Sequence, residues 1–286
     1  MPAIVVERRE GLRYEDIERE YQWPLRPVVV PGLCADWPAF KTWTLPYLRD
    51  RFPRFQVRVD GSMVALGPFI DEVLAATPER PCRYLRECYL AKVLPEVLPE
   101  LSPIPGQPRN RTQSRLVPLG DAYRNEAGPP ELLISGPGTF FPVLHYDLHH
   151  LHAFITQLQG DKEFTVFPPG EAENLYPRED RRQVSRIDCF DPVDLARFPR
   201  FANATPIRFR VNAGDTVFVP SGWWHFTRTL SPSLAITWNS VSRANWRAFT
   251  EDHFLGEGRQ RGLKPTLKRL YLRVIGVMLT AIERGP

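Results

Sequence analysis

Residues 131–167 read ELLISGPGTFFPVLHYDLHHLHAFITQLQGDKEFTVF, and residues 212–225 read NAGDTVFVPSGWWH. Both stretches consist of short apolar runs that are interrupted by Gly, Pro, Asn and Asp. Short strands at even spacing, with turn signals between them, are typical of an all-β sandwich or barrel. The same pattern holds from about residue 131 to residue 242, so we expect the barrel core there.

The segments around this core have a mixed character. Residues 1–60 alternate short helical patterns with apolar runs, and FQVRVDG at 55–61 alternates as a half-buried strand does. A more polar connection follows, after which residues 83–101 fit either a strand or a short helix. The charged insertion at 170–206 has little periodicity, so we expect it to be a surface excursion from the barrel.

After Asn245 the pattern is helical to the end of the sequence, and the last helix has a broad apolar face. The residues of this face are Leu267, Leu270, Leu272, Val274, Ile275, Met278 and Leu279. A helix this apolar must pack on something, either on its own barrel or in a homodimer interface. We therefore expect a domain at 1–245 and a helical segment at 246–286 that docks or dimerises.

Charge and composition exclude little about the partners of this chain. The 286 residues include 37 basic and 33 acidic side chains, so the net charge of +4 permits an anionic partner without requiring one. The basic runs RNRTQSR, REDRR and RQRGLKPTLKR are usually solvated faces, which makes nucleic acid an unfavoured partner.

Neither an export signal nor a membrane span is visible in the sequence. The longest apolar stretch near the end, YLRVIGVMLTAIE, is interrupted by Arg273 and is too short to cross a bilayer. The four cysteines lack the close CxxC spacing of a zinc or redox site. We read them as free thiols and expect a cytoplasmic protein.

Three residues in the barrel region have the character of metal ligands. His145 and Asp147 are two residues apart, so on a strand their side chains point to the same face. Such a pair is common by chance, but His225 follows a Gly-Asp turn, an alternating strand and a Pro-Ser-Gly bend. Two histidines and one carboxylate with open positions form the arrangement used for non-haem Fe(II) oxygen chemistry.

A lysine in the same region is a candidate for binding an organic acid. A 2-oxoacid that chelates the metal leaves a distal carboxylate, which needs a cation inside the barrel. Lys162 follows a Gly-Asp pair, early in a strand whose alternation places Lys162, Phe164 and Val166 on one face. The alternative is that this lysine extends outward to solvent.

The ordered set HYD, GDKEFTVFPP, IDCFDPVDLARFP, GDTVFVPSGWWH and ITWNS resembles the JmjC-like cupin oxygenases. This group contains the asparaginyl hydroxylase factor inhibiting HIF and the tRNA wybutosine hydroxylase. The front half, RPVVVPGLCADWPAFKTWTLPYLRDRF, is similar to the entry segment of the family, so the resemblance extends to about residue 245. It implies a double-stranded β-helix (jelly-roll, cupin) core, with an α/β N-terminal segment and C-terminal helices.

The resemblance also implies roles for individual residues. It implies that His145, Asp147 and His225 bind Fe(II), and that Lys162 binds the distal carboxylate of 2-oxoglutarate. Tyr84 matches a tyrosine of the family that binds the same carboxylate. Asn239 matches an asparagine of the family that lines the cosubstrate pocket.

The chain departs from the family pattern next to these residues. Pro142 stands where many relatives have a hydroxyl residue, so that hydrogen bond is absent or comes from elsewhere, with Thr139 as the candidate. The segment between Asp147 and Gly160 is two residues longer than in factor inhibiting HIF, and Ala153 replaces an asparagine. An altered wall of the pocket is therefore expected.

Three further histidines follow Asp147, namely His149, His150 and His152. No carboxylate or cysteine accompanies them at ligand spacing, which disfavours a second metal site. A role in the wall of the pocket or in contacting substrate is the better interpretation, and simple surface exposure is the alternative.

These observations predict an Fe(II)- and 2-oxoglutarate-dependent dioxygenase that uses O₂ and releases succinate and CO₂. By analogy with the named hydroxylases, we expect hydroxylation of a protein or peptide side chain. The alternatives are a free amino acid, another small metabolite or a tRNA base. A non-catalytic cupin that serves as a metal-binding scaffold is the alternative from another class.

Overall fold

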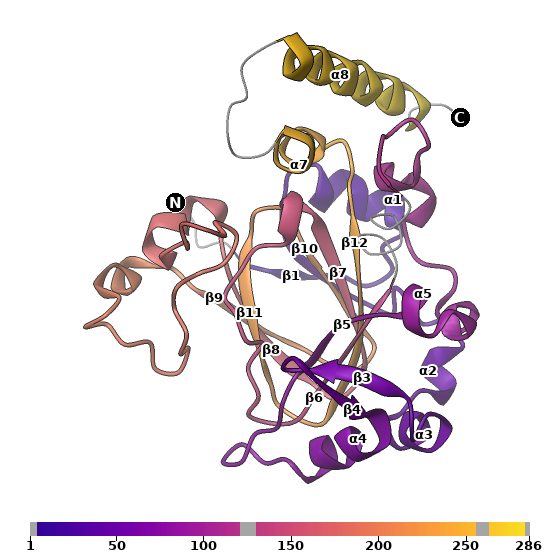
Figure 1. The fold of residues 1–286 in the computed structure, drawn as a ribbon, viewed down its shortest axis with the longest axis vertical. Coiled ribbons are helices and arrows are strands. Elements are labelled where there is room, and N and C mark those ends of the chain that lie inside the picture. Colours follow the sequence, from indigo (N-terminus) through magenta and orange to yellow (C-terminus); the bar gives the residue numbers. More distant parts are fainter. Residues whose placement is uncertain (1–4, 121–129, 256–262, 284–286) are drawn as a thin grey trace.

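In the computed structural model, residues 5–120, 130–255 and 263–283 are described, and they form two β-sheets with helices at both ends (Figure 1). The large sheet has nine strands. In spatial order they are β1 (Glu7–Arg8), β2 (Val28–Pro31), β10 (Asp215–Val219), β7 (His152–Gln159), β12 (Ser233–Ser240), β6 (Glu131–Ser135), β5 (Leu85–Tyr89), β3 (Gln56–Val59) and β4 (Ser62–Ala65). All neighbours are antiparallel except β1 and β2.

The small sheet has three antiparallel strands. Their order is β11 (Trp224–Thr229), β8 (Lys162–Phe167) and β9 (Ile207–Val211). Apolar side chains from the inner faces of both sheets form one buried cluster, which includes Ile155 and Val217 from the large sheet and Phe164 and Val166 from the small one. The predicted cupin jelly roll is confirmed, because the two sheets enclose a common interior.

The strand β7 illustrates why the central strands read as continuous apolar runs. Ala153 and Ile155 face the barrel interior, whereas Phe154 and Leu158 belong to a second cluster on the outer face. N-terminal helices cover this outer face, so both faces of β7 are buried. A strand that is buried on both faces loses the simple alternation of polar and apolar residues.

The N-terminal segment contributes most of the short helices. They are α1 (Tyr14–Ile17), the π-helical η1 (Glu18–Gln22), α2 (Ala39–Thr42), α3 (Leu45–Arg51), α4 (Leu66–Ala75), α5 (Leu90–Val93) and the 3₁₀ turns η2 (Pro95–Leu101), η3 (Gln107–Arg109) and η4 (Arg111–Gln113). Helix α3 begins at Leu45, because the Thr44 hydroxyl caps it by accepting a hydrogen bond from the Tyr47 amide at 3.1 Å.

The remaining helical elements are η5 (Leu148–His150), η6 (Pro169–Leu175), η7 (Pro199–Asn203), α7 (Trp246–Leu255) and α8 (Leu263–Glu283). Figure 1 places α7 and α8 at the end of the barrel opposite to α3 and α4. Helix α8 packs through Leu272, Ile275 and Leu279 into a cluster with Trp246 and Phe249 of α7. No helix among the described residues is long and apolar enough to cross a membrane.

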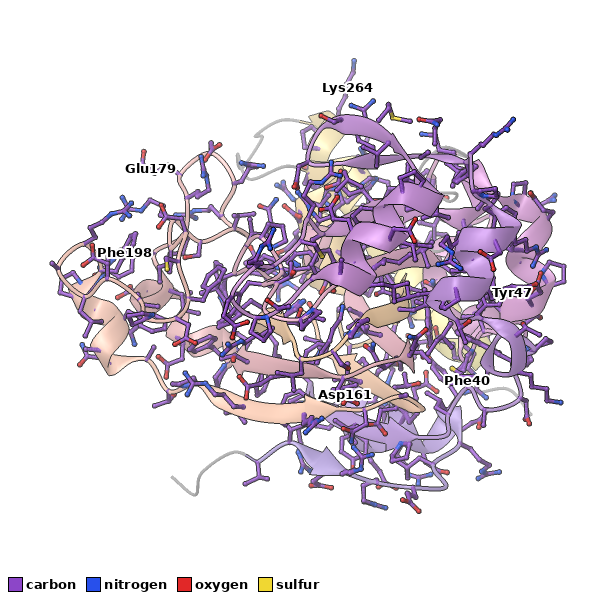
Figure 2. The ribbon with its side chains drawn as sticks, turned by 90° about the horizontal axis from the view of Figure 1, so that it is seen from below. Phe40, Tyr47, Asp161, Glu179, Phe198 and Lys264 are labelled. Carbon is purple, nitrogen blue, oxygen red and sulfur yellow. The ribbon has the colours of Figure 1, made fainter. Side chains whose placement is uncertain are left out.

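The insertion at 170–206 has more structure than the sequence predicted. Its Leu175, Ile187 and Phe198 are buried in a cluster with Phe167 and Trp224 of the small sheet. Seen from below, Figure 2 shows the labelled Glu179 and Phe198 in this insertion, far from Tyr47 of α3. The insertion is thus a packed cover of the small sheet rather than a simple surface excursion.

Candidate metal centre and cosubstrate pocket

The two histidines of the predicted triad meet through their backbones. His145 lies in the loop before η5, and His225 is the second residue of β11. The His145 amide donates to the His225 carbonyl at 3.1 Å, and the His225 amide donates to the His145 carbonyl at 2.7 Å. Residues that exchange both hydrogen bonds lie directly opposite each other with side chains on the same face. The imidazole centroids are 4.4 Å apart as a result.

Hydrogen bonds determine which imidazole nitrogen faces the centre. His145 Nδ1 lies 3.2 Å from the Val143 carbonyl oxygen, and His225 Nδ1 lies 3.1 Å from the Trp223 carbonyl oxygen. A carbonyl oxygen can only accept, so each Nδ1 is the protonated nitrogen and each Nε2 keeps its lone pair. This is the tautomer that a metal-binding histidine needs.

Asp147 completes the cluster from the start of η5. Its Oδ2 is 3.9 Å from His225 Nε2, and one ligand atom from each of the three residues lies within 4.8 Å of the others. Asn239 Nδ2 donates to Asp147 Oδ1 at 3.1 Å and to the His152 carbonyl at 3.2 Å. The amide of Asn239 therefore orients the carboxylate and leaves the second oxygen free for a metal.

The charge states of these residues suit a divalent cation. Burial is the main reason why the pKa of His145 lies well below its ordinary value, so its imidazole is neutral at pH 7. Burial also raises the pKa of Asp147, although His225 and Asn239 oppose this effect. A desolvated carboxylate beside two imidazoles is stabilised by a cation between them. Two nitrogen donors and one oxygen donor with open positions fit Fe(II).

A cavity of about 100 Å³ extends from the triad into the barrel. Its lining consists of Tyr84, Glu131, Leu133, Phe141, His145, Asp147, Ala153, Ile155, Lys162, Phe164, His225, Thr227, Thr237 and Asn239. The structure thus brings together the triad, Lys162, Tyr84 and Asn239, as the sequence predicted. Ala153 also lines this cavity, in the wall where the chain departs from the family pattern.

Lys162 lies at the far end of this cavity from the metal ligands. It is 1% exposed, and its Nζ donates to Tyr84 Oη at 2.5 Å. Lys162 pairs with Thr229 in the register of β8 and β11. Thr229 lies four residues along β11 from His225, so the level of Lys162 is roughly 13 Å along the strand from the level of His225. The described residues provide no carboxylate within ion-pair distance of Lys162, and burial lowers its pKa to about 7. An elongated dianion that reaches from the metal ion to the Lys162 ammonium would fill this cavity and pair with the charge of the lysine.

One predicted residue lies elsewhere. The Thr139 hydroxyl donates to the Cys82 carbonyl at 3.1 Å, and Thr139 does not line the cavity. In the structure, the hydroxyl of Thr139 is thus turned toward Cys82, and its replacement of the hydroxyl missing at Pro142 stays a prediction. Thr227 Oγ1 is in a better position, since it is buried in the cavity wall without a hydrogen-bond partner among the described residues.

Sequence reasoning missed Thr227, Thr237 and Glu131. The first two could have been found by the two-residue period of strands, since Thr227 follows His225 and Thr237 precedes Asn239 on the same faces. Glu131 begins β6 and carries no signal of this kind.

The three histidines after Asp147 have separate environments. His149 Nδ1 lies 2.9 Å from Asp252 Oδ2 of α7, and the His150 ring stacks on Tyr146 at 4.8 Å. His152 is fully buried between Ser221 and Ser242, and burial lowers its pKa to about 3. Within the described ranges, the triad at the cavity is the one cluster of three potential metal ligands.

The fold and this centre together define a metal-binding cupin. The family model described as a cupin-like domain matches residues 14–241, which is well over half of the chain. The chain therefore belongs to the cupin-like domain family, and its resemblance to the JmjC-like cupin oxygenases is confirmed.

Several curated proteins are similar to the chain over most of its length. Lysine-specific demethylase JMJ21 of Arabidopsis thaliana is 29% identical over 84% of this chain and 26% of its own length. Arginine-specific demethylase JMJ22 of the same organism is 29% identical over 84% of this chain and 47% of its own length. Lysine-specific demethylase 8 of Danio rerio is 25% identical, with 82% and 58% coverage. The chain thus spans less than two thirds of each of these relatives.

Proposed function

We propose that the protein is an Fe(II)- and 2-oxoglutarate-dependent dioxygenase that oxidises a side chain of a protein or peptide. The observation that carries this proposal is the convergence of a two-histidine, one-carboxylate centre and a buried, carboxylate-free lysine in one cavity. Bound Fe(II), together with 2-oxoglutarate and O₂, supplies an oxidant for unactivated C–H bonds, with succinate and CO₂ as coproducts.

The residues of the chain then have distinct tasks. His145, Asp147 and His225 hold the metal, and the Lys162 ammonium holds the distal carboxylate with help from the Tyr84 hydroxyl. Apolar walls such as Leu133, Ile155 and Phe164 exclude water from the space between them. A dry cavity strengthens the pairing of lysine and carboxylate, because the effective dielectric constant is low.

The names of the relatives support a protein side chain as substrate, since two are called lysine-specific and one arginine-specific demethylases. Hydroxylation that leaves the oxygen on the substrate is our first proposal. Demethylation of an N-methylated side chain is the second candidate, favoured by those names. Both begin with insertion of oxygen into a C–H bond and differ in whether formaldehyde then leaves.

Mass spectrometry of peptides incubated with the protein, Fe(II), 2-oxoglutarate and O₂ tests the proposal. Peptides encoded next to this gene are the first to examine, and methylated lysine and arginine peptides are the second set. We expect a gain of one oxygen, whereas loss of a methylene group with release of formaldehyde supports demethylation. Succinate should form in the wild type but not in His145→Ala or Asp147→Ala. Substantial succinate formation by both variants refutes the assignment of the metal centre.

We also propose that residues 1–245 form the catalytic domain and that 246–286 form a segment that both docks and dimerises. One face of α8 packs on α7, while Leu267, Leu270, Val274, Val277 and Ile282 are exposed on the rest of the helix surface. A single apolar stripe can pair with its own copy about a twofold axis, so we infer a homodimer. The four cysteines are free, in keeping with the cytoplasmic location that we propose.

A further inference from the structure

One buried hydroxyl group in the cavity wall lacks a hydrogen-bond partner. Seven buried side-chain atoms of the described residues lack one, and of these only Thr227 Oγ1 belongs to a residue that lines the cavity. The residue is 6% exposed, so water does not replace the missing partner freely. An unpaired buried polar group costs free energy, and native proteins keep few of them. A position beside a ligand cavity indicates that the partner is a ligand.

Strand β11 places Thr227 between the metal ligands and Lys162. His225 and Thr227 both line the cavity, as expected for residues two apart on one strand. Thr229, two residues further along, is the register partner of Lys162. Thr227 is thus roughly 7 Å along β11 from the level of His225 and from that of Lys162. Its side chain borders the space that the cosubstrate would occupy.

The backbone and the side-chain type both restrict where this hydroxyl group can point. Thr227 pairs with Phe164 in the register of β11 and β8, and its carbonyl accepts a hydrogen bond from the Phe141 amide at 2.8 Å. Threonine is branched at Cβ, so its χ1 rotamers are few on a strand that is held from both sides. The hydroxyl group therefore has little freedom to find another partner within the protein.

The same hydroxyl group is close to the residues at the lysine end of the cavity. Burial raises the pKa of the Tyr84 phenol, and the nearby hydroxyls of Thr227 and Ser135 oppose this rise. Ser135 Oγ is paired with Thr229 Oγ1 at 2.7 Å, and Tyr84 Oη accepts from Lys162 Nζ at 2.5 Å. Thr227 Oγ1 is near the phenol without completing a hydrogen bond to it. Its proton is thus available to an acceptor that enters beside the lysine.

We propose that Thr227 is a cosubstrate-binding residue whose hydroxyl group donates a hydrogen bond to the distal carboxylate of 2-oxoglutarate, beside the Lys162 ammonium. This inference rests on the proposed function and adds a residue to its site. Thr227 supplies from β11 the hydroxyl contact that Pro142 cannot make. The hydroxyl group is unpaired in the free protein and gains a charged acceptor when the cosubstrate binds, so its whole contribution goes to binding.

The variant Thr227→Val tests the contact, because valine has nearly the same shape and lacks the hydroxyl group. The Fe(II) protein is titrated anaerobically with 2-oxoglutarate and with 2-oxopentanoate, in which a methyl group replaces the distal carboxylate. The charge-transfer band reports the binding of both. A hydrogen bond to a charged group corresponds to at least about a tenfold change in affinity. The variant should show this loss for 2-oxoglutarate and bind 2-oxopentanoate to within about twofold of wild type.

Unfolding in denaturant, without metal or cosubstrate, provides a second measurement that does not depend on activity. The free protein gains nothing from an unpaired hydroxyl group, so Thr227→Val should unfold at the same denaturant concentration as wild type or at a higher one. The matched control is Thr216→Val on β10, outside the cavity, where the hydroxyl is paired with Thr156 Oγ1 at 2.7 Å. This control should unfold at a lower concentration and keep its affinity for 2-oxoglutarate.

Three results would overturn the proposal. Thr227→Val could bind 2-oxoglutarate as tightly as wild type, or it could lose equal affinity for both oxoacids. The tenfold loss could also occur in Thr139→Val instead, which would assign the contact to Thr139. A wild-type protein that develops no charge-transfer band with 2-oxoglutarate refutes the proposed function and this contact with it. A loss confined to 2-oxoglutarate in Thr227→Val, without a loss of stability, supports the proposal.

Discussion

At the scale of single residues, hydrogen bonds within the protein arrange the candidate metal centre. Backbone carbonyls fix the tautomers of His145 and His225, and Asn239 orients the carboxylate of Asp147. Loss of such an outer contact typically costs about 10–100-fold in metal affinity or activity. The closeness of the ligand atoms therefore follows from hydrogen bonds within the protein.

Lys162→Met provides a test of cosubstrate binding at one residue. Methionine nearly matches the lysine stem in volume, so it removes the charge with little change in packing. A charged hydrogen bond contributes about 1.5–3 kcal/mol, and the dissociation constant for 2-oxoglutarate should rise at least about tenfold. Equilibrium titration measures it, with Fe(II) binding in the absence of 2-oxoglutarate as the control that should stay unchanged. Unaltered 2-oxoglutarate affinity would show that Lys162 does not bind the distal carboxylate.

The lowered pKa of Lys162 predicts a pH dependence of the same binding step. Only the protonated ammonium attracts a carboxylate, and its fraction in the free protein falls as the pH rises through about 7. Affinity for 2-oxoglutarate should therefore be constant below this pH and weaken above it, by up to about tenfold per pH unit. Titrations across this range measure the slope. The decline should be missing in Lys162→Met, and an equal decline in both proteins would assign it to another group.

The sequence predicted the chemistry of the site better than its detailed contacts. The triad and Lys162 were predictable because strand alternation and metal chemistry restrict which residue types can lie together. The contact of Thr139 was not predictable, since its hydroxyl donates to the Cys82 carbonyl in a loop where Gly138 has a φ of 79°. Glu131 was missed because its place in the cavity wall depends on β5 and β12, which are distant in sequence.

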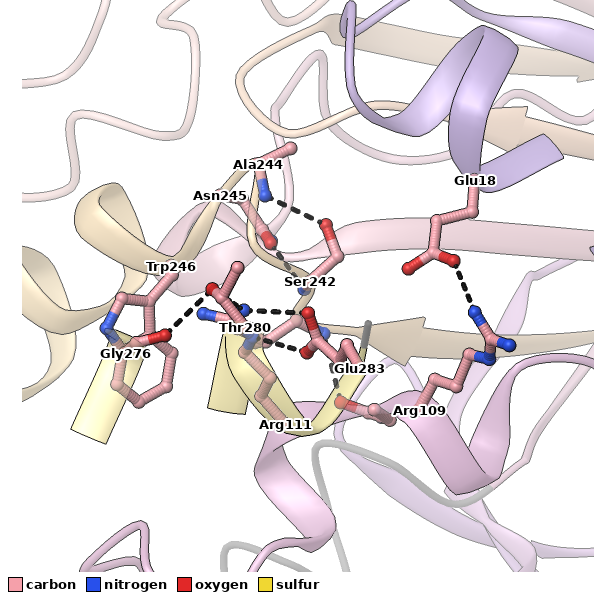
Figure 3. A network of polar contacts seen from close by, with 12 residues as sticks. Glu18, Arg109, Arg111, Ser242, Ala244, Asn245, Trp246, Gly276, Thr280 and Glu283 are labelled. Carbon is pink, nitrogen blue, oxygen red and sulfur yellow. Dashed lines mark hydrogen bonds and ion pairs between the residues drawn. The ribbon is translucent and has the colours of Figure 1, made fainter. Parts of the chain in front are cut away.

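At the scale of elements, the C-terminal helices support the loop that carries Asp147. Helix α7 contacts η5, Asn245 Nδ2 donates to the His150 carbonyl at 2.8 Å, and His149 pairs with Asp252. Figure 3 shows how α8 is attached in turn, with Arg111 between Thr280 and Glu283 at hydrogen-bond distances of 2.7–2.8 Å. The contacts of α7 and α8 with the rest of the protein thus include the loop that carries Asp147.

Gly276→Ala tests the contact between α7 and α8. A Cβ at this position would lie 2.4 Å from Trp246 Nε1, an atom that donates to the Leu272 carbonyl at 3.1 Å. Severe overpacking costs about 3 kcal/mol, whereas alanine gains about 1 kcal/mol in helix propensity, so we expect a net loss of about 2 kcal/mol. Denaturant unfolding measures the change, with the exposed Lys264→Ala as control (Figure 2). A stabilised Gly276→Ala variant would contradict the close contact.

The elements themselves were predictable to different degrees. Strand β3 alternates in burial as FQVRVDG predicted, and residues 83–101 proved to contain both a strand and short helices. Helix α4 lies where we expected a polar connection, and it buries Phe69 and Ile70. Its apolar residues pack against the outer face of the large sheet. Local periodicity does not reveal such a long-range contact.

At the scale of the whole molecule, the exposed stripe of α8 predicts a homodimer. Val277 is 71% exposed, the largest exposed fraction among these residues. Val277→Glu would place two like charges in the proposed interface, so it should yield a monomer with an intact fold. Light scattering coupled to size-exclusion chromatography distinguishes the two masses, and Lys264→Glu on the same helix is the control. A wild-type protein that stays monomeric at all accessible concentrations excludes this interface.

The central claim is that one cavity binds Fe(II) through His145, Asp147 and His225 and binds 2-oxoglutarate between the metal and Lys162. Anaerobic titration of the protein with Fe(II) and then 2-oxoglutarate tests it most directly, because chelation of the metal by a 2-oxoacid gives a metal-to-ligand charge-transfer band. We expect one equivalent of the band in wild type, none in Asp147→Ala, and saturation only at higher 2-oxoglutarate concentration in Lys162→Met. A wild-type protein that binds Fe(II) but develops no band is a metal-binding scaffold and contradicts the account.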